Sequence, residues 1–476
     1  MATKTMYKTI SLVSITLLLW ACNIPKLAVR NEKKQVPPAY INVTDTTNVA
    51  KLTWKKYFSD PLLNALIDTA LKNNQELNII NQEIEISKNE IRARKGEYLP
   101  FVGLFGGAGV DKEGSYTWRK AMEENIDATK NEKAISSNND FTFGASASWE
   151  IDVWKKLRNA KKAAVSRYLA SIEGKNFMIT NLVSEVASAY YELMALDNML
   201  DLVDKNIALQ GNALKVVKEQ KEAAKVTQLA VNRFEAQLLH TKNLQYEIKQ
   251  QLIETENSIN FLTGRFPQPI QRNSVAFFDL TIDSISSGIP SQLLANRPDI
   301  KQAEMELTSY KLDVLAARAN FYPSFSLKAG VGFQAFNPAF LINPKSIIYN
   351  MAGDLVAPLI NRNAIKTIYL NANAKKIQAI YNYEKTILNA HIDVLNHLSK
   401  ISNYSNSYNT KLQEVNILLQ SVNIANNLFY SARADYAEVL LTQREALESK
   451  MELIEIKMKQ IHAKVNIYRA LGGGWK

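Results

Sequence analysis

Cysteine and histidine are the scarcest reactive residues in this sequence. A single cysteine, Cys22, occurs among 476 residues, so no disulfide can form within the chain. The four histidines are dispersed, and His391 and His397 are six positions apart, which is poor spacing for two ligands on one helix face. The sequence also lacks a His-Glu-x-x-His motif, a phosphate-binding loop and a serine nucleophile elbow. We therefore expect no enzyme, no metal site and no cofactor.

Proline and glycine are missing from long parts of the chain. Proline is absent between Pro100 and Pro267 and again after Pro358. Glycine is absent between Gly353 and Gly472. Because proline interrupts a helix interior and glycine weakens it, these gaps leave room for very long helices. The formal net charge is +11, but the lysines are spread through these stretches, so we interpret them as solvated helix faces and expect no nucleic-acid partner.

The sequence begins with a typical export signal. Lys4 and Lys8 precede an apolar run at residues 10–20, which is too short to cross a bilayer as a helix. The run ends in Leu19-Trp20-Ala21-Cys22, which resembles the bacterial lipobox, where the signal is cleaved before a cysteine that then carries lipid. The next residue, Asn23, is not acidic. By resemblance to enterobacterial lipoprotein sorting, this argues against retention in the inner membrane. An ordinary signal peptide with an incidental cysteine is the alternative.

The rest of the sequence repeats itself once. At an offset of 223 residues, Asn73-Asn74-Gln75-Glu76-Leu77 aligns with Asn296-Arg297-Pro298-Asp299-Ile300. Farther along, an offset near 208 aligns Val186 with Val394 and the ending at residues 262–264 with that at 471–473. We therefore expect two similar structural units, each with the order helix, strands and long helices. The expected segments are a signal peptide at 1–21, a lipid-anchored linker at 22–60, a first repeat at 61–264, a linker at 265–295 and a second repeat at 296–473.

Two segments alternate strictly between apolar and polar side chains. Residues 141–153 place seven apolar side chains at every second position, and residues 324–335 place six. This period predicts strands with one apolar face. Weaker strands are expected at 101–110 and 347–359, and each is close to the roughly 9–11 residues of a tilted membrane strand. The polar segments 111–140 and 336–346 are expected to be the loops between paired strands.

Four strands are too few to close a membrane pore. Membrane barrels begin at about eight strands, and an open sheet edge in lipid leaves backbone groups without hydrogen bonds. The strands must therefore be completed by other copies of the chain. The alternation by itself would also fit a soluble sandwich, but the strands come as two pairs separated by very long helices.

Coiled-coil seams occupy the long segments between the strand pairs. Between about residues 155 and 222, apolar residues recur every seven positions, as they do again between 387 and 429. A helix of about 65 residues is roughly 100 Å long. Returning helices are expected after reversals near Ala223-Ala224-Lys225 and Ala432-Arg433-Ala434-Asp435. Because residues 149–154 lead directly into Lys155-Lys156-Leu157-Arg158, we expect the strand to pass into the helix without a break, which favours a tunnel joined to a pore over a self-contained helical stalk.

Four motifs occur in order along nearly the whole mature chain. They are Trp54-Lys55-Lys56-Tyr57-Phe58-Ser59-Asp60-Pro61-Leu62, Ser148-Trp149-Glu150-Ile151-Asp152, the segment 293–304 around Asn296-Arg297-Pro298-Asp299-Ile300, and Phe321-Tyr322-Pro323-Ser324-Phe325-Ser326-Leu327. Their residues and their order resemble those of the TolC-like outer membrane factor family, in particular its lipoprotein branch that works with resistance-nodulation-division pumps. Lys155-Lys156, Ala224 and Ala434 depart from the family, whose members often have glycine at these places.

The resemblance implies a mixed α/β membrane protein of the bacterial outer membrane. Three copies would form a 12-stranded β-barrel, with four strands per chain, continuous with a long periplasmic α-helical coiled-coil barrel. Such a channel is the passive subunit of a tripartite efflux system that conducts drugs or toxic compounds to the exterior. Its partners would be outer-membrane lipid, a periplasmic adaptor protein and an inner-membrane pump that supplies the energy. An exit duct for type I protein secretion and a structural coiled-coil lipoprotein are the alternatives.

The resemblance also suggests roles for individual residues. Asp435 and Glu438 match acidic positions that ring the periplasmic constriction, whereas Leu441 stands where some relatives have another acid. Arg297 and Asp299 are expected to cap helices and form interhelix ion pairs rather than to bind cargo. The expected adaptor contacts at the hairpin tips are Ala223, Ala224, Lys225, Arg433, Ala434 and Tyr436, and the expected lumen-facing residues are Glu150, Asp152 and Lys328.

Overall fold

The computed structural model describes residues 24–40, 47–112, 114, 116–118, 138–280, 287–431 and 433–475. Cys22, the expected lipidation site, lies outside these residues. The chain divides into two compact units. The strand unit comprises Met1–Asn31, Glu85–Tyr168 and Met305–Ile380, and the helical unit comprises Glu32–Ile84, Leu169–Glu304 and Tyr381–Lys476.

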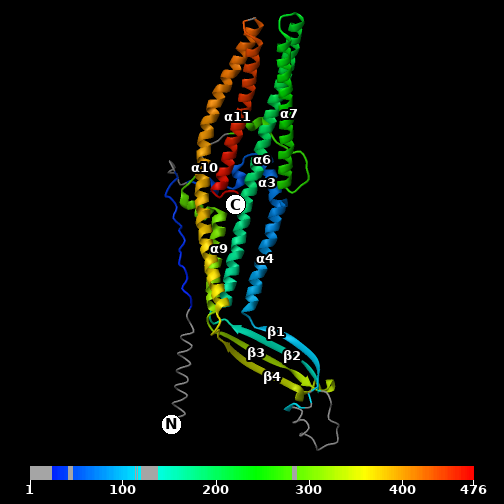
Figure 1. Cartoon of the computed structure of the whole chain (residues 1–476), viewed down its shortest axis with the longest axis vertical. Coiled ribbons are helices and arrows are strands. Elements are labelled where there is room, and N and C mark those ends of the chain that lie inside the picture. Colours follow the sequence, from blue (N-terminus) through cyan, green and yellow to red (C-terminus); the bar gives the residue numbers. More distant parts are fainter. Residues whose placement is uncertain are drawn as a thin grey trace, which may run out of the picture. The chain divides into compact units, whose positions relative to one another are not determined.

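The main elements follow the same order in both halves of the chain (Figure 1). The first half contains α4 (Gln75–Glu97), β1 (Phe101–Asp111), β2 (Asn138–Ile151), α6 (Lys156–Glu222) and α7 (Gln228–Leu262). The second contains α9 (Pro298–Ala319), β3 (Ser324–Ala335), β4 (Ile347–Val356), α10 (Asn363–Tyr430) and α11 (Tyr436–Ala470). Shorter helices are α2 (Trp54–Tyr57), α3 (Pro61–Asn73), α8 (Leu293–Asn296) and the 3-10 turns η1 (Val49–Lys51), η2 (Ser274–Phe277), η3 (Pro290–Gln292), η4 (Pro338–Phe340) and η5 (Pro344–Ser346).

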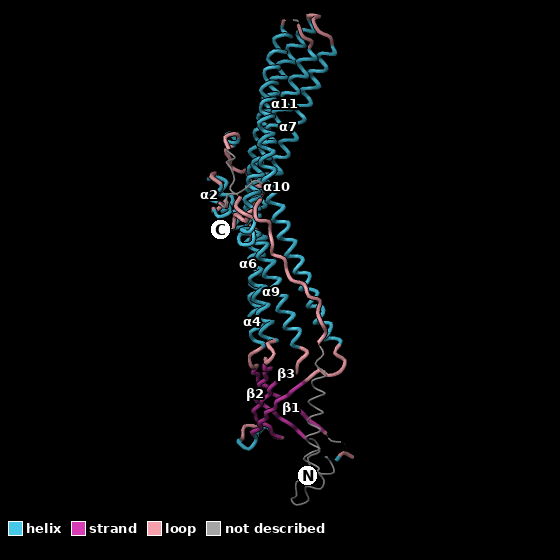
Figure 2. Tube along the Cα trace, turned by 90° about the vertical axis from the view of Figure 1, so that its left-hand side faces the viewer, coloured by secondary structure: helices cyan, strands magenta, loops and turns pink. Residues whose placement is uncertain are grey.

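The strand unit is built on one antiparallel sheet in the order β1-β2-β3-β4 (Figure 1). Its strands are drawn in magenta in Figure 2. All four expected strands are therefore present. β2 and β3 each pair on both sides, whereas β1 and β4 each have one strand neighbour among the described residues. The outer edges of β1, 11 residues long, and of β4, 10 residues long, thus carry backbone groups that this sheet does not pair.

The strand register sorts the side chains of the sheet onto two distinct faces. Ala145 of β2 lies between Leu104 of β1 and Val331 of β3, and Val331 pairs in turn with Tyr349 of β4. We call this side the apolar face. The neighbouring positions form the polar face, which carries Thr142, Ser146, Ser148, Glu150, Ser326, Lys328, Gln334, Asn350 and Asp354.

The junction between β2 and α6 corrects the expectation of an unbroken passage from strand to helix. β2 ends at Ile151 and α6 begins at Lys156, with a turn between them. Lys155 has a φ of 59°, in the left-handed region that glycine adopts most easily. Asn361 has a φ of 53° at the matching junction before α10. A short non-strand segment with a left-handed residue, which period-two alternation does not reveal, therefore separates each strand from its long helix.

The helical unit contains two antiparallel hairpins, formed by α6 with α7 and by α10 with α11 (Figure 1). The first-half seam is buried: Val186, Leu193 and Val203 are fully inaccessible. Gln210, which interrupts that seam in the sequence, is buried as well. Within the described part of the chain, no helix has an apolar stretch long enough to cross a membrane.

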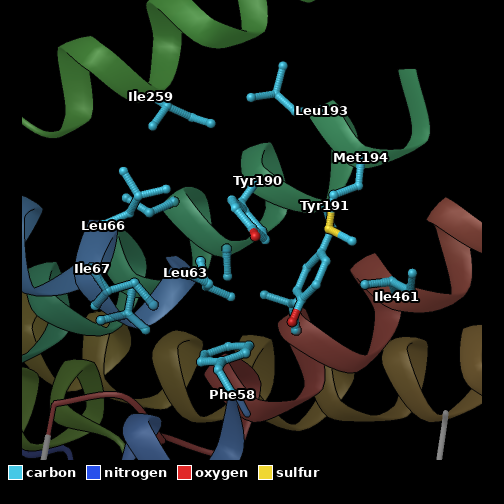
Figure 3. Close-up of a cluster of buried hydrophobic side chains, with 14 of the residues drawn as sticks. Phe58, Leu63, Leu66, Ile67, Tyr190, Tyr191, Leu193, Met194, Ile259 and Ile461 are labelled. Atoms are coloured by element: carbon cyan, nitrogen blue, oxygen red, sulfur yellow. The ribbon is translucent and has the colours of Figure 1, made fainter. Parts of the chain in front are cut away.

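The main hydrophobic core of the helical unit lies where α3 packs against α6, α7 and α11 (Figure 3). Leu63, Tyr190 and Ile259 are fully buried within it. Asp60 fixes the start of α3, because its carboxylate accepts hydrogen bonds from the backbone N–H groups of residues 62 and 63. The same carboxylate accepts a 2.7 Å hydrogen bond from the Tyr190 hydroxyl. The sequence motif at residues 54–62 therefore anchors α3 to α6.

Glycines end both returning helices in the same way. Gly264 follows α7 with a φ of 66°, and Gly472 follows α11 with a φ of 87°. A Cβ atom on Gly264 would lie 2.4 Å from the carbonyl oxygen of Asn73, and one on Gly472 would lie 2.7 Å from that of Asn296. Only glycine satisfies both the positive φ and the close backbone contact. The two glycines therefore hold the ends of α7 and α11 against equivalent chain segments.

Candidate functional site

Arg297 lies at the start of α9 and joins three elements of the helical unit. Its guanidinium donates hydrogen bonds of 3.0 and 2.7 Å to the two carboxylate oxygens of Asp299. It also lies 3.4 Å from a carboxylate oxygen of Asp393 on α10. A further 2.8 Å hydrogen bond reaches the carbonyl oxygen of Ala470, the last residue of α11. These contacts confirm the expected ion pairing between helices and place a cation at a helix C-terminus, where it is stabilised.

The surroundings of Asp393 indicate that this cluster has a structural role and does not bind cargo. Burial opposes ionisation of Asp393, but the hydrogen bond from His397 and the charge of Arg297 lower its pKa below the usual value. Both Arg297 and His397 are themselves buried. The adjoining cavity, bordered by Asn181 and Arg469, has a volume of about 110 Å³. A space of that size holds a few water molecules, not a transported compound.

Asn74 makes the equivalent contact in the first half of the chain. Its side-chain amide donates a 3.0 Å hydrogen bond to the carbonyl oxygen of Leu262, the last residue of α7. Its oxygen accepts a 2.9 Å hydrogen bond from the backbone N–H of Leu77 and so caps α4. The two halves thus fix the end of a returning helix with the same geometry, by a neutral amide at Asn74 and by a charged group at Arg297.

His462 is a half-buried titratable group on α11. Its Nε2 lies 3.1 Å from the carbonyl oxygen of Ser188 on α6. A carbonyl oxygen can only accept, so the nitrogen donates. Burial lowers the pKa of His462, and the hydrogen bond to Ser188 and the charge of Glu192 offset this effect only in part. The folded protein therefore takes up a proton at this site at lower pH than the unfolded chain does.

We expect the protein to lose thermal stability as the pH falls from about 7 to 5, because the unfolded chain binds protons at histidine from about pH 6.5 downward. His462→Gln should flatten this dependence, since glutamine can still donate to Ser188 but does not titrate. Burial also lowers the pKa of His391, so some dependence will remain. His240→Gln, at an exposed position of α7, is the matched control. Melting temperatures at each pH test the prediction, and identical pH profiles for the two variants would contradict it.

The tip between α6 and α7 is a compact helix cap. The backbone N–H of Ala224 donates to the carbonyl of Lys221, and that of Lys225 donates to the carbonyl of Gln220, both at 2.9 Å. This is the Schellman pattern, with Ala224 at the left-handed position and a φ of 50°. The second tip repeats the longer bond, from the Arg433 N–H to the carbonyl of residue 428 at 2.8 Å. The expected tip residues Ala223, Ala224, Lys225 and Arg433 are exposed, and Ala434 is half-buried.

Ala224→Gly should stabilise the first tip by about 1 kcal/mol, because glycine adopts a positive φ without the strain of a Cβ atom. Hydrogen exchange of the backbone amides at residues 220–226 should then slow roughly fivefold. Ala223→Gly is the matched control, since the φ of Ala223 is not positive and glycine there only weakens the helix end. Faster exchange in Ala224→Gly than in the wild-type protein would contradict the assignment.

The expected gate residues lie at the start of α11. Asp435 is at the N-cap position without a capping hydrogen bond from its side chain, and Glu438 is in the first turn. Both side chains are exposed. Tyr436, between them, packs against the cluster that contains Phe234 of α7, and the Arg233 guanidinium lies 6.0 Å from its ring centroid. Tyr436 therefore links the two hairpins, while the two acids on either side of it are exposed.

The expected lumen-facing residues differ in position. Lys328 and Glu150 lie on the polar face, where Lys328 pairs with Asp354 of β4 at 3.0 Å and Glu150 pairs with Lys156 at 2.6 Å. Asp152 lies beyond the end of β2, so the expectation that it alternates within the strand is wrong. Its carboxylate accepts hydrogen bonds from the backbone N–H groups of residues 157 and 158 and thereby caps α6. Asp354 has no strong sequence signal, because β4 alternates only weakly.

A family profile matches most of the chain. The profile of the outer membrane efflux protein family matches residues 66–265 and 289–473. The chain belongs to this family. The first match contains the helices and strands of the first half of the chain, and the second match contains those of the second half. The first match begins within α3.

Curated relatives match the efflux protein over nearly its whole length. The pyoverdine export outer membrane protein OpmQ of Pseudomonas putida is 27% identical over 475 residues, covering 99% of this chain and 98% of the relative. The cation efflux system protein CusC of Escherichia coli is 24% identical over 468 residues, covering 97% of this chain and 98% of the relative. Among solved structures, the open state of the Neisseria gonorrhoeae MtrE outer membrane channel has a TM-score of 0.82 at 21% identity, covering 95% of this chain and 98% of that chain.

Family and relatives together identify the function of this efflux protein as that of an outer-membrane efflux channel. The relatives are channel and transport proteins rather than enzymes. Within the described residues, no group of three or more histidine, cysteine, aspartate or glutamate side chains is arranged to hold a metal ion.

Proposed function

We propose that three copies of the chain form one outer-membrane channel. The observation that carries this proposal is the sheet of four strands, in which β1 and β4 each leave one edge unpaired and one face is apolar. Exposed edges are very unfavourable in lipid, so β1 of one copy would pair with β4 of the next. Three sheets joined in this way give a closed barrel of twelve strands, within the range of membrane barrels. The polar face would then line the water-filled lumen, with Glu150 and Lys328 in its wall.

The long helices would continue this pore as a tunnel through the periplasm. α6 has 67 residues and α10 has 68, which corresponds to about 100 Å each at 1.5 Å per residue. The matching order of the elements in the two halves supports a duplicated unit, with repeats at residues 61–264 and 296–473. Residues 265–295 would join the two repeats, and residues 22–60 would link the first repeat to the membrane anchor.

The residues after Cys22 support a lipid anchor at that cysteine, following cleavage of residues 1–21. Ile24 and Leu27 pack against the cluster that contains Phe321 and Tyr369 in the strand unit. Phe321 lies three residues before β3 begins. The described part of the N-terminal segment, which begins at Ile24, thus lies beside the helix-side end of the sheet. The acyl chains could then enter the same bilayer as the barrel.

The hairpin tips would dock a periplasmic adaptor, and an inner-membrane pump would supply the energy. The exposed residues of the tips, together with Ala434 and Tyr436, offer a surface for such contacts. The relatives export chemically different compounds, among them cations and pyoverdine. Because the same architecture serves these different compounds, we propose that the channel conducts small molecules and that the pump, of the resistance-nodulation-division type, selects the cargo.

Asp435 and Glu438 would form an acidic ring where three copies of α11 meet at the periplasmic tips. Asp435→Ala combined with Glu438→Ala should therefore raise the concentration of a multivalent cation needed for half-block roughly tenfold, with the cation applied from the tip side in single-channel recordings. Glu219→Ala combined with Glu222→Ala removes the same charge from exposed positions near the first tip and is the control. Unchanged block in the first variant, or an equal change in the control, would contradict the gate.

Reconstitution of the purified protein into phosphatidylcholine planar bilayers tests the channel itself. We expect stepwise conductance from an oligomer whose mass in native mass spectrometry equals three chains. A stable single chain without conductance, although folded by circular dichroism, would instead favour a structural coiled-coil lipoprotein.

A further inference from the structure

A basic cavity lies in the strand unit next to the helix-side end of the sheet. Its volume is about 520 Å³. Three cations and two hydroxyl groups line it together with two apolar side chains, so the cavity suits a ligand with an anionic and an apolar part. The lining residues are Tyr98, Arg158, Lys161, Lys162, Val165, Ser166 and Leu312.

Aromatic side chains mark the level of this cavity along the strands. The indole N–H of Trp149 donates a 3.1 Å hydrogen bond to the carbonyl oxygen of Tyr98. The indole N–H of Trp154 donates a 2.7 Å hydrogen bond to the carbonyl oxygen of Pro323. Both indoles remain partly exposed, at 37% and 43%. Tryptophan and tyrosine gather where a membrane barrel meets the polar headgroups. Lys161 and Lys162 follow the start of α6 by five and six residues, or about 8–9 Å along the helix, which is the depth of a headgroup layer.

The positive charge at this level is only partly neutralised. Five cations occur within residues 155–162. Glu150 pairs with Lys156 at 2.6 Å, and Asp152 pairs with Arg158 at 3.1 Å. No carboxylate in the described part of the chain forms an ion pair with Lys161 or Lys162; the Lys161 ammonium instead lies 5.6 Å from the centroid of the Tyr98 ring. An anion in the cavity would therefore meet cations that the protein has not already paired.

The matching position in the second half of the chain is already filled. At the offsets that align the two halves, Tyr98 corresponds to Phe321, and Lys161 corresponds to Tyr369. The Lys161 ammonium lies over the Tyr98 ring, and the Tyr369 ring likewise contacts the Phe321 ring. There the N-terminal segment that begins at Ile24 occupies the position: Ile24 and Leu27 pack against the cluster that contains Phe321 and Tyr369. The Ala28 carbonyl accepts a 3.2 Å hydrogen bond from Asn373, the counterpart of Val165. One half thus holds the segment that leads to the proposed lipid anchor, while the other half presents an open basic cavity.

We propose that this cavity binds the headgroup of an anionic phospholipid from the membrane leaflet next to the helices. The lipid phosphate would lie among Arg158, Lys161 and Lys162, and the glycerol and first acyl carbons would lie against Val165 and Leu312. This inference rests on the proposed placement of the sheet in the outer membrane. The site would help to fix the depth of the channel in the bilayer at the position that the N-terminal segment leaves open.

Native mass spectrometry of the assembled channel, extracted in mild detergent and incubated with phosphatidylglycerol or phosphatidylcholine, tests the site. We expect retention of phosphatidylglycerol at roughly tenfold lower lipid concentration than phosphatidylcholine. Lys161→Gln combined with Lys162→Gln should abolish this preference, whereas Arg158 is left intact because it pairs with the helix-capping Asp152. Lys242→Gln combined with Lys249→Gln, at exposed positions of α7, removes equal charge and should retain the preference.

Three outcomes would overturn the proposal. Equal retention of the two lipids by the wild-type channel would show that the cavity does not select charge. Unchanged preference in the Lys161→Gln, Lys162→Gln variant would place the selective site elsewhere. Displacement of the lipid by millimolar glycerol phosphate would indicate a site for a soluble anion. Conductance of the same preparations in phosphatidylcholine bilayers separates the two proposals, because a conducting channel without lipid preference would refute the lipid site alone.

Discussion

Arg297→Ala should destabilise the helical unit by about 3–5 kcal/mol, because it removes one partner from a buried ion pair and leaves the others uncompensated. The carboxylates of Asp299 and Asp393 would lose their cation, and the carbonyl of Ala470 would lose its donor. Because these contacts join α9, α10 and the end of α11, the three helices would no longer be linked at this point. Thermal unfolding in detergent, followed by circular dichroism at 222 nm, should show a clearly lower melting temperature.

Arg94→Ala is the matched control for this effect. Arg94 also bonds two carboxylates, those of Glu90 and Glu97, but its side chain is 40% exposed. Exposed pairs contribute only about 0–1 kcal/mol, so this variant should melt close to the wild-type protein. Arg297→Lys should fall between the two, since lysine keeps the charge but cannot donate to both oxygens of Asp299 in the same geometry. Equal melting temperatures for Arg297→Ala and Arg94→Ala would show that the buried cluster contributes no special stability.

Ala145→Arg should prevent most of the protein from inserting into membranes. Ala145 lies in the middle of β2 on the apolar face, between Leu104 and Val331. An arginine facing lipid near the bilayer centre costs about 2–4 kcal/mol, and a trimer would carry three of them. The fraction of heat-resistant oligomer in the outer-membrane fraction, measured by gel mobility with and without boiling, should fall strongly.

Ser146→Arg provides a control one residue away. Ser146 lies on the polar face, opposite Gly103 on β1 and Gly330 on β3, and its side chain is exposed. In a water-filled lumen an arginine there remains solvated, so assembly should be close to normal and only conductance should change. A reversal of the two results would mean that the apolar face does not meet lipid.

The periodic features of the sequence predicted the secondary structure closely. The expected strand at 324–335 coincides with Ser324–Ala335, and the expected helix from about 155 to 222 coincides with Lys156–Glu222. Period-two and period-seven patterns are local, and each reports directly which side chains share a face. The pattern misleads where a turn continues the alternation by chance. It predicts a strand position for Asp152, although β2 ends at Ile151 and the Asp152 carboxylate caps α6.

The contacts at the candidate sites were harder to predict. Ion pairing by Arg297 was expected from its motif, but its partner Asp393 is 96 residues away along the chain. The basic cavity combines Tyr98, the first turns of α6 and Leu312 of α9, which no spacing rule connects. The link between Tyr436 and the Phe234 cluster likewise joins two hairpins that are distant in sequence.

The sequence alone determined the four amphipathic strands, the long seams and the duplicated order, because these depend on side-chain periodicity along a continuous backbone. The tertiary structure decided which of two matching positions is filled by the N-terminal segment and which stays open and basic. It also decided which carboxylates neutralise which cations. Such choices depend on burial and on distances between segments remote in the chain, and the free energy of pairing two charges is set by the surroundings that folding creates.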